Sequence, residues 1–373
     1  MDRQGSPLHD RVSTQNRTTS RKSPLAALKS DPELSARFEL LRRLGRDVRS
    51  SEYHLTNACN IRCDGCWFFA KDFDQRTEDR GTEADWKRFA QEQAESGVTA
   101  GLLIGGEPTL YPDRVRAFVD HLTFVTISSN GLVALQREGF ENVAIALTLF
   151  GGGPLDDELR AIKPSGKRFE GLFDRALANY KHDDRATFIY ALDGRATDYI
   201  EDTVRKIRDN GNLVTFNYYS DYGTKSNEPG TGEFHLLEEA LRIQQKYPET
   251  VICHPYYIRA LITGKTEWGS FGYHSCPSIS SDHPDHAERR KNGNPVLPGF
   301  NTWAADRETV NFCCTSGDCS SCRDSQAVYS WLLANPRKFM RSDAGVETWI
   351  EVAEAYWRQF KWSELHPSAS PTA

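Results

Sequence analysis

Three closely spaced cysteines constrain this chain more than any other feature of its sequence. Cys59, Cys63 and Cys66 form the pattern CxxxCxxC, so one loop can bring three thiolates to one metal centre. Thiolates are soft ligands that favour iron–sulfur clusters, zinc or Cu(I) over magnesium or calcium. A closed zinc site needs four ligands, whereas three cysteines leave one iron of a four-iron cluster open for a substrate or cofactor. Residues 53–56 are the end of an expected short strand, which puts the cysteines in a strand-to-helix loop, where function tends to lie.

A second motif, GGEP, directly follows the apolar run 101–104. With the cysteine triplet before it, this order resembles the radical S-adenosylmethionine (radical SAM) enzymes. In that family the second strand ends in GGEP, whose backbone and carboxylate hold the amino group of SAM. The residue types suit this role, because glycines allow close backbone approach and a carboxylate pairs with an ammonium. The resemblance therefore implies that SAM is bound by Gly105, Gly106, Glu107 and Pro108.

One position departs from the family pattern. Most members carry an aromatic residue before the third cysteine, where it packs on the SAM adenine, but here Gly65 stands there. Trp67, directly after the third cysteine, is the expected substitute, and the alternative is a core tryptophan at the start of a helix. Ser128 and Asn130, in an SSNG turn, and Thr148, at the end of a strand, are further candidates for the SAM pocket. Their alternatives are a plain Asn-Gly turn and a plain strand-end threonine.

Short apolar runs alternate with amphipathic segments from residue 51 to about 223. The expected strands span residues 53–56, 101–104, 124–128, 143–149, 187–192 and 213–218. Strands that alternate with helices indicate a parallel sheet. Six such units match the partial barrel of the family resembled, whose active site lies at the carboxyl ends of the strands. We therefore predict an α/β fold with a partial (β/α)6 TIM-like barrel over 51–248, preceded by a disordered tail at 1–30 and a helix at 31–50.

The remaining cysteines lie late in the chain. They are Cys253, Cys276, Cys313, Cys314, Cys319 and Cys322. Residues 302–314 indicate a hairpin that ends in cysteine, and a CxxC pair follows at 319 and 322. This arrangement resembles the auxiliary-cluster module called SPASM or, in its shortened form, twitch, which binds another 4Fe-4S cluster beside the barrel. The resemblance implies a small cysteine-rich α+β module over 249–335, with Cys276, Cys313 or Cys314, Cys319 and Cys322 as ligands. A structural zinc site from the same residues is the alternative.

Two further features of the later part of the chain are a cysteine outside the ligand set and a C-terminal apolar helix. Cys253 stays outside this ligand set, and a free cysteine is most often a small buried hydrophobe. The alternative hypothesis is that Cys253 donates a hydrogen atom to a substrate radical, as in radical SAM epimerases that this architecture resembles. Residues 336–373 indicate a C-terminal helix and tail, whose apolar face is expected to pack against the barrel or the module.

Composition excludes several classes of protein. The chain has 373 residues, 38% hydrophobic and 26% charged, which is typical of a soluble globular protein. A net charge of -6 does not indicate a nucleic-acid partner. No apolar run reaches the roughly 18 residues of a membrane span, and no secretory core follows Met1. Nine cysteines in two clusters fit metal binding in a reducing compartment. We therefore predict a cytoplasmic protein with neither a membrane nor a nucleic-acid partner.

The resemblance also implies a reaction. A 4Fe-4S cluster with one open iron would bind SAM, and an electron from a donor such as flavodoxin or ferredoxin would cleave it to a 5′-deoxyadenosyl radical. We predict a radical SAM oxidoreductase, with epimerase and lyase left open, that acts on a small polar metabolite such as an aminocyclitol or amino sugar. The alternatives are a radical SAM peptide maturase and a non-catalytic iron–sulfur or zinc-binding protein. Candidate substrate contacts at strand ends are Tyr190, Asp193, Asn217 and Tyr219.

Overall fold

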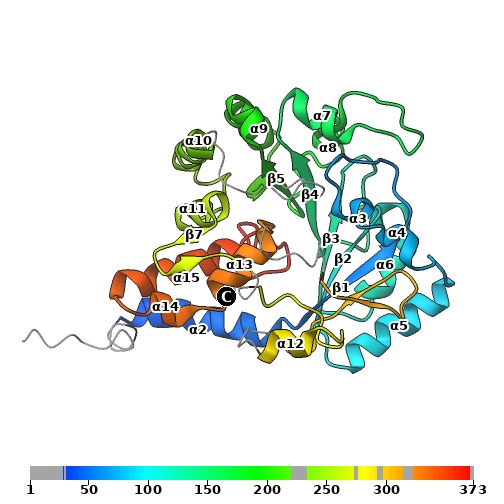
Figure 1. Cartoon of the computed structure of the whole chain (residues 1–373), viewed down its shortest axis with the longest axis horizontal. Helices are drawn as coiled ribbons and strands as arrows, with labels where there is room; N and C mark the ends of the chain where they lie inside the picture. The colour runs from blue at the N-terminus through cyan, green and yellow to red at the C-terminus, as the bar shows by residue number, and fades with distance from the viewer. Residues whose placement is uncertain are drawn as a thin grey trace, which may run out of the picture.

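Six parallel strands form the framework of the structure (Figure 1). They are β1 (Ser50–Thr56), β2 (Ala100–Gly105), β3 (Phe124–Ser129), β4 (Ala144–Phe150), β5 (Ala186–Leu192) and β6 (Leu213–Tyr218). Each strand pairs in parallel with the next along the chain. This confirms the α/β class and the six-unit partial barrel. The computed structural model describes Leu28 and residues 31–219, 233–272, 276–291, 297–313 and 322–369, without the side chains of 289 and 290.

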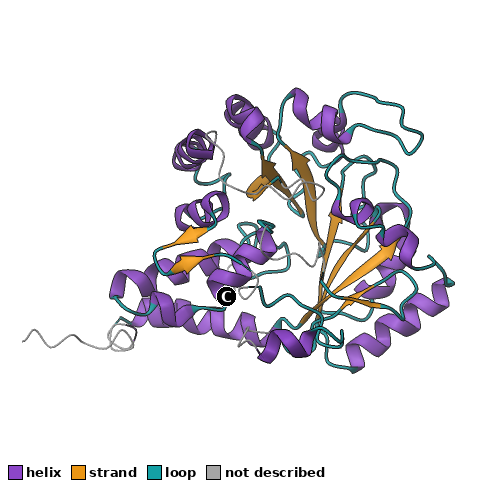
Figure 2. Cartoon of the chain, viewed as in Figure 1, coloured by secondary structure: helices purple, strands orange, loops and turns teal. Residues whose placement is uncertain are grey.

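Helices connect the strands and lie on the outer side of the sheet (Figure 2). The longer ones are α5 (Glu83–Glu95), α6 (Pro112–Val119), α8 (Leu172–Asn179), α9 (Ile200–Asp209) and α10 (Glu233–Lys246). A capping box of Thr82 and Asp85 begins α5, since each side chain bonds to the backbone N–H of the other. Tyr53 of β1 packs its ring against Phe89 of α5 and Phe118 of α6. Aromatic side chains on the outer face thus join the helices to the sheet.

Strand alternation sends the neighbouring side chains to the inner face. In β3, Val125 and Ile127 belong to the main hydrophobic core, whereas Thr126 and Ser128 line an internal cavity. The same two-residue period selects the cavity-facing residues of β4 and β5, which are Ala144, Ala146, Thr148, Phe150, Thr187, Ile189 and Ala191. Small and hydroxyl-bearing residues on these strands therefore leave room inside the barrel for a ligand.

The hairpin expected at 302–314 is present, and it joins the barrel sheet. Strand β9 (Thr302–Trp303) pairs in parallel with β1, and β10 (Val310–Asn311) pairs antiparallel with β9. The strand order is therefore β10-β9-β1-β2-β3-β4-β5-β6. In the hairpin turn, the Arg307 guanidinium lies 4.8 Å from the ring of Trp86 in α5. Residues predicted to form a separate module thus extend the sheet of the barrel.

Shorter elements complete the described chain. Most are shorter than the helices above, although α11 and α13 have nine residues each. They are the helices α3 (Trp67–Ala70), α4 (Phe73–Arg76), α7 (Pro154–Arg160), α11 (Pro255–Thr263), α12 (His286–Lys291), α13 (Ser325–Leu333) and α14 (Pro336–Phe339), the 3-10 turns η1 (Pro108–Leu110) and η2 (Gly194–Tyr199), and the paired strands β7 (Lys265–Thr266) and β8 (Gly269–Ser270). Among the described helices, none combines the length and the apolar character that crossing a bilayer would require.

The first and last helices of the described chain pack together. The predicted N-terminal helix is α2 (Pro32–Asp47), and the C-terminal helix is α15 (Asp343–Trp357). Arg37 makes two hydrogen bonds of 2.7 Å to the Glu354 carboxylate, and the rings of Phe38 and Trp349 lie 5.8 Å apart. The tail predicted to be disordered, 1–30, lies outside the described residues except for Leu28.

The segment after α15 closes the amino-terminal end of the barrel. The indole N–H of Trp362 donates to the Thr126 hydroxyl over 3.1 Å, and the Lys361 ammonium lies 2.6 Å from the Asp184 carboxylate. The Thr187 hydroxyl donates to the Gln359 carbonyl over 3.3 Å. Because these contacts reach the early residues of β3 and β5, the C-terminal segment forms the floor of the internal cavity.

Candidate functional site

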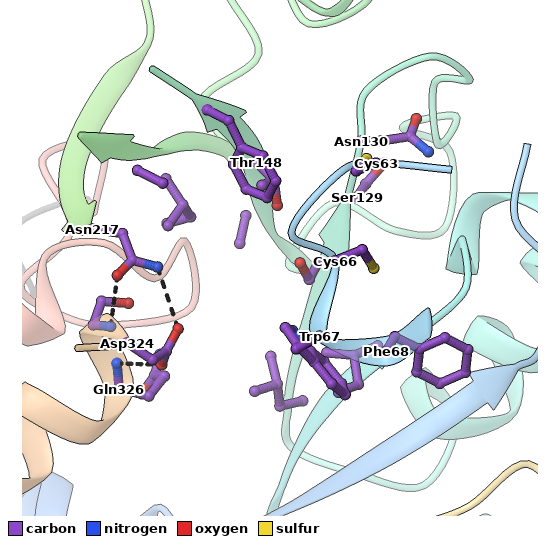
Figure 3. Close-up of a pocket in the computed structure, with 18 of the residues that line it drawn as sticks. Cys63, Cys66, Trp67, Phe68, Ser129, Asn130, Thr148, Asn217, Asp324 and Gln326 are labelled. Atoms are coloured by element: carbon purple, nitrogen blue, oxygen red, sulfur yellow. Dashed lines mark hydrogen bonds between the residues drawn. The ribbon is translucent and has the colours of Figure 1, made fainter. Parts of the chain in front are cut away.

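An internal cavity of about 240 Å³ gathers residues from all six strands (Figure 3). Its lining includes the cysteine triplet, Gly105 to Glu107, Ser128 to Asn130, Thr148, Asn217 to Tyr219, and Asp324 to Gln326. Segments separated by most of the length of the chain therefore meet around one space. Among the described residues, no three His, Cys, Asp or Glu side chains converge in the way that ligands of one metal ion do.

The cysteine triplet lies at one wall of this cavity. Cys59, Cys63 and Cys66 are half-buried, and all three face the cavity. Burial raises the pKa of Cys59 to about 12 and raises the pKa values of Cys63 and Cys66, and the proximity of Cys66 adds to the rise for the other two. Such thiols stay protonated at neutral pH unless a positive group stabilises the thiolates. What suits these residues to a metal centre is their donor type, since a bound soft cation stabilises thiolate and displaces the protons.

Backbone hydrogen bonds hold the cysteine loop against the segment that ends α7. The Arg62 N–H donates to the Ile162 carbonyl, and the Asp64 N–H donates to the Leu159 carbonyl, each over 2.7 Å. Between these two anchors, the Arg160 side chain turns inward to the cavity. The loop conformation is therefore set by a partner about a hundred positions away, although its cysteines lie close together in sequence.

Arg160 is a buried cation beside the triplet that sequence reasoning missed. Its Nη1 donates to the Asp156 carboxylate over 2.9 Å, and its Nη2 donates to the Asn130 carbonyl over 3.4 Å. Asp156 and Cys63 both raise the pKa of this guanidinium against the opposing effect of burial. Its Nε–H, although buried, has no acceptor among the described residues. The pair lies at positions i and i+4 of α7, a spacing that is common on exposed helices and therefore gave no signal.

The GGEP motif packs directly on the cysteine loop. The Gly106 N–H donates to the Thr56 carbonyl over 2.7 Å, and the Glu107 N–H donates to the Ala58 carbonyl over 2.8 Å. A Cβ atom on Gly106 would lie 1.9 Å from the Ala58 oxygen, and Gly105 has a φ of 120°. Both glycines are thus required here because two stretches of backbone touch. The predicted contact of Gly105 and Gly106 with SAM does not follow from this packing and stays a prediction.

Glu107 joins the ends of β2 and β3. One carboxylate oxygen accepts the Thr109 N–H over 3.1 Å and the Thr109 hydroxyl over 2.7 Å. The other accepts the Asn130 N–H over 2.8 Å. Burial raises the pKa of Glu107, and these hydrogen bonds oppose the rise. Pro108 begins η1 directly after it and is buried. Glu107 therefore has a structural role, and its predicted contact with a SAM ammonium stays a prediction.

The structure brings the other predicted SAM contacts to the same cavity. Ser128, Asn130, Thr148 and Trp67 all line it. The Asn130 side-chain amide donates to Asn60 over 2.7 Å and lies 3.9 Å from the Cys59 sulfur. The Trp67 ring packs against aromatic neighbours, with centroids 5.7 Å from His54 and 5.6 Å from Phe73. Trp67 therefore belongs to an aromatic cluster and also borders the cavity, beside Cys66 in Figure 3.

The second cysteine set is only partly described. Cys276, Cys313 and Cys322 are each buried, with exposed fractions of 7%, 7% and 6%. Burial raises the pKa of Cys322, and the proximity of Cys276 and Cys313 adds to this rise. Three of the predicted ligands thus lie near one another, although 46 positions separate the first from the last. Cys314 and Cys319 lie outside the described residues.

Cys253 lies in the main hydrophobic core. Its sulfur accepts the Phe216 N–H over 2.8 Å and is 3.1 Å from the Thr215 hydroxyl. Burial raises the pKa of Cys253 to about 11, and the residue is 2% exposed. It is not part of the cavity lining. Its role as a hydrogen donor stays a prediction, and its surroundings are those of a buried core cysteine.

The four predicted substrate contacts divide into two groups. Asn217 and Tyr219 line the cavity. Tyr190 is buried, and its hydroxyl donates to the Gly151 carbonyl over 2.8 Å, whereas Asp193 pairs with Arg195 at 2.7 Å. The latter two are not in the cavity lining. Sequence reasoning placed all four at strand ends but could not assign a direction to each side chain.

A family model supports the resemblance first seen in the two motifs. The model described as Radical SAM superfamily matches residues 53–223. This range contains the cysteine triplet, GGEP and all of β2 to β6. A search of curated proteins by sequence found no match.

Solved structures overlap this fold at low sequence identity. Streptococcus suis SuiB bound to S-adenosylmethionine is 17% identical over 59% of this chain and 56% of its own, with a TM-score of 0.41. Native anSMEcpe with bound AdoMet is 10% identical over 87% and 92%, with a TM-score of 0.46. Methylornithine synthase (PylB) is 18% identical over 59% and 72%, with a TM-score of 0.33. This chain therefore spans little more than half of the SuiB chain, and similarity at this level does not define an activity.

Proposed function

Because residues 53–223 match the radical SAM superfamily, we propose that this protein is an enzyme that reductively cleaves SAM and abstracts hydrogen from a small polar metabolite. One observation carries the proposal. The cysteine triplet, the GGEP turn and the polar strand ends all border one internal cavity. A cofactor held by the triplet and a substrate held by the strand ends would therefore lie next to each other in one space.

Cys59, Cys63 and Cys66 would hold a 4Fe-4S cluster with one open iron. A reduced cluster held there would supply the one electron that reductive cleavage of SAM requires. The chain's own residues would hold the thiolates in place through the backbone hydrogen bonds of the cysteine loop. The Arg160 guanidinium would stabilise the anionic centre, because it is buried beside Cys63 and interacts with that thiol.

The SAM molecule would lie between the GGEP turn and Trp67. Gly105, Gly106 and Glu107 offer backbone groups at the cavity edge, while Asn130 and Thr148 offer an amide and a hydroxyl. Trp67 provides the aromatic surface that Gly65 lacks. Ser128 and Pro108 complete the predicted set, Ser128 in the lining and Pro108 as the residue that fixes the turn after Glu107.

A second 4Fe-4S cluster is proposed for Cys276, Cys313 or Cys314, Cys319 and Cys322. Support comes from the proximity of the three described thiols and from their burial. Four thiolates would close all iron positions, so this centre would not bind SAM. A structural zinc ion is the alternative occupant of the same ligands.

The substrate is proposed to be hydroxylated, as in an aminocyclitol or amino sugar. Side chains that can hydrogen-bond such a molecule line the cavity between the triplet and the C-terminal segment, and they are Thr126, Thr148, Thr187, Asn217, Gln326 and Gln359. The reaction would be an oxidation, with epimerisation or elimination as alternatives, and an external flavodoxin or ferredoxin would supply electrons. A peptide substrate is the alternative from the wider family.

Anaerobic reconstitution with iron and sulfide tests the proposal. After dithionite reduction, the wild-type protein should convert SAM to 5′-deoxyadenosine, and the variant Cys59→Ala/Cys63→Ala/Cys66→Ala should not. Cys253→Ala is the matched control, since it removes a buried cysteine outside the cavity, and it should retain SAM cleavage. Reconstituted wild-type protein that binds iron but forms no 5′-deoxyadenosine would favour the non-catalytic alternative.

A further inference from the structure

A short hairpin, residues 161–169, packs on the cysteine loop from outside the cavity. Its two arms pair through an antiparallel bridge, and the Lys163 N–H donates to the Lys167 carbonyl over 2.9 Å. Gly166 in the turn has a φ of 80°, and a Cβ atom there would meet no other atom within 4 Å. The cavity lining includes none of these nine residues. We refer to residues 161–169 as the basic hairpin, whose tip projects into open space.

The base of the basic hairpin lies against two of the proposed iron ligands. Ala161 is buried with Ile61 in a small hydrophobic cluster. Phe169, Cys59 and Cys63 pack against the same cluster. The hairpin therefore forms the outer surface over these two thiols, while the cavity lies on their other side.

The tip of the basic hairpin carries positive charge that the protein does not neutralise. Lys163, Lys167 and Arg168 are exposed, and the hairpin contains no acidic residue. The nearest acidic residues along the chain, Glu158 and Glu170, lie beyond its base. Neither lysine forms an ion pair with a described residue, although the chain as a whole has a net charge of -6. Charge concentrated in this way attracts an oppositely charged partner before contact is made.

Two arginines extend this charge from the hairpin to the cysteine loop. Arg168 lies 3.7 Å from the Asp64 carboxylate, with side chains 57% and 60% exposed. Such an exposed pair contributes little, so Arg168 can exchange Asp64 for a carboxylate of a partner at little cost. The Arg62 guanidinium lies 3.7 Å from the centroid of the Phe69 ring, and it has no carboxylate partner among the described residues. The cationic surface thus reaches the loop that carries the ligands.

The geometry of the proposed reaction requires electrons to enter from this side. Each SAM cleavage consumes one electron, which a separate carrier must deliver to the metal centre. SAM and the substrate would fill the cavity side of the triplet. Because electron transfer slows steeply with distance, the carrier has to bind where the ligand cysteines lie close to the outer surface. The basic hairpin is packed directly on two of them.

We infer that the basic hairpin is the docking surface for an acidic one-electron carrier protein. This deepens the proposed function and rests on it, because it assigns a place and a charge to the electron donor. The carrier is oxidised by one electron as the metal centre is reduced by one, and no covalent bond changes in the transfer. Lys163 and Lys167 would mainly raise the rate of association, as charges at the edge of an interface do.

A comparison of two reductants tests the inference on the reconstituted protein. A flavodoxin of acidic isoelectric point is reduced to its hydroquinone, and its reoxidation by the protein is followed by stopped-flow absorbance. Lys163→Glu/Lys167→Glu should lower the second-order rate constant about tenfold at low ionic strength. With dithionite, a small reductant that needs no docking surface, this variant should form 5′-deoxyadenosine at the wild-type rate, which also shows that it is folded and loaded.

A matched variant and a salt series serve as controls. Arg337→Glu/Lys338→Glu makes the same charge change at two exposed positions of α14, away from the cysteine loop, and should leave the flavodoxin rate constant unchanged. Added salt should slow the reaction of the wild type with flavodoxin and should affect Lys163→Glu/Lys167→Glu much less, since ions screen exposed charges.

The outcomes for docking and for catalysis are distinguishable. Equal flavodoxin rate constants for the wild type and Lys163→Glu/Lys167→Glu would overturn the inference. An equal loss in the α14 variant, or no reduction of the wild type by the flavodoxin, would overturn it as well. Absence of 5′-deoxyadenosine from the dithionite-reduced wild type would instead count against the proposed function.

Discussion

The two cysteine sets of this protein are built in opposite ways. Cys59, Cys63 and Cys66 come from one loop, are half-buried and face a cavity. Cys276 lies 37 positions before Cys313 and 46 before Cys322, and all three are buried. The first set thus borders a space that a ligand can enter, whereas the described members of the second set are shielded from solvent. This difference teaches that local spacing suffices to bring the first three thiols to one loop, whereas the second set comes together only when distant parts of the chain fold back on each other.

The largest expected effect is the loss of SAM cleavage when a cysteine of the first set, but not of the second, is replaced. Cys63→Ala should abolish 5′-deoxyadenosine formation and lower the iron content of reconstituted protein by about four per chain. Cys322→Ala should also lose about four irons but retain SAM cleavage. Iron analysis and product chromatography check both results. If Cys322→Ala lost no iron and zinc were recovered from wild-type protein, the second set would be structural.

The next effect concerns the buried ion pair that supports the first set. Arg160→Met leaves the Asp156 carboxylate buried without its partner and should destabilise the protein by about 3 kcal/mol. Asp156→Asn in the same background should restore part of this loss, because the unpaired charge is gone while the hydrogen bond from the Phe150 N–H is kept. Urea unfolding of the two variants measures both. Equal stability of Arg160→Met and wild type would show that the pair contributes nothing to folding.

A glycine substitution tests how tightly GGEP packs on the cysteine loop. Gly106→Ala places a Cβ atom 1.9 Å from the Ala58 oxygen, so the loop must shift, at a cost of about 1–3 kcal/mol. Gly45→Ala is the control, because Gly45 lies in α2 with open space around it and should gain about 0.5–1 kcal/mol. Thermal unfolding compares the two, and SAM affinity should fall only for Gly106→Ala. An unchanged melting temperature for Gly106→Ala would mean that the cysteine loop accommodates the added methyl group without loss of stability.

The smallest effect concerns the hairpin that leads to the second set. Burial would raise the pKa of Asp306, but hydrogen bonds from the Thr309 and Glu308 N–H groups and from the Thr309 hydroxyl lower it below 3.8. Since the folded pKa is the lower one, this stabilisation is complete above 3.8 and is lost as the pH falls through the folded value. Asp306→Asn should therefore cost about 1 kcal/mol at neutral pH and flatten the acid limb of the stability curve. Identical acid limbs for variant and wild type would contradict this.

The sequence predicted the barrel well because its signals are local. The expected strand at 213–218 coincides with β6, and the one at 143–149 differs from β4 by a single residue at each end. Apolar runs bounded by turn residues fix such strands through short-range patterning. The helices α7, α11 and α13 were not predicted. They have only seven to nine residues, too few to show a clear amphipathic period, and tertiary packing stabilises them.

The candidate site was predicted only where its residues are close in sequence. Cys59, Cys63, Cys66 and GGEP were found from spacing and order. Arg160 and Asp324 were not, because a lone charged residue is usually an exposed one, and burial cannot be read from type alone. Their significance comes from the partners around them, which lie on other segments of the chain.

The sequence by itself determined the six-unit α/β pattern, the cysteine loop and the motif that follows it, since each depends on neighbours a few positions apart. Only the tertiary structure decided that the late hairpin extends the barrel sheet through β1, that the segment after α15 forms the cavity floor, and that Asp324 faces the cysteine triplet. These contacts join residues separated by up to hundreds of positions. Their free energy comes from burial and hydrogen bonding in the folded chain, and no local pattern encodes it.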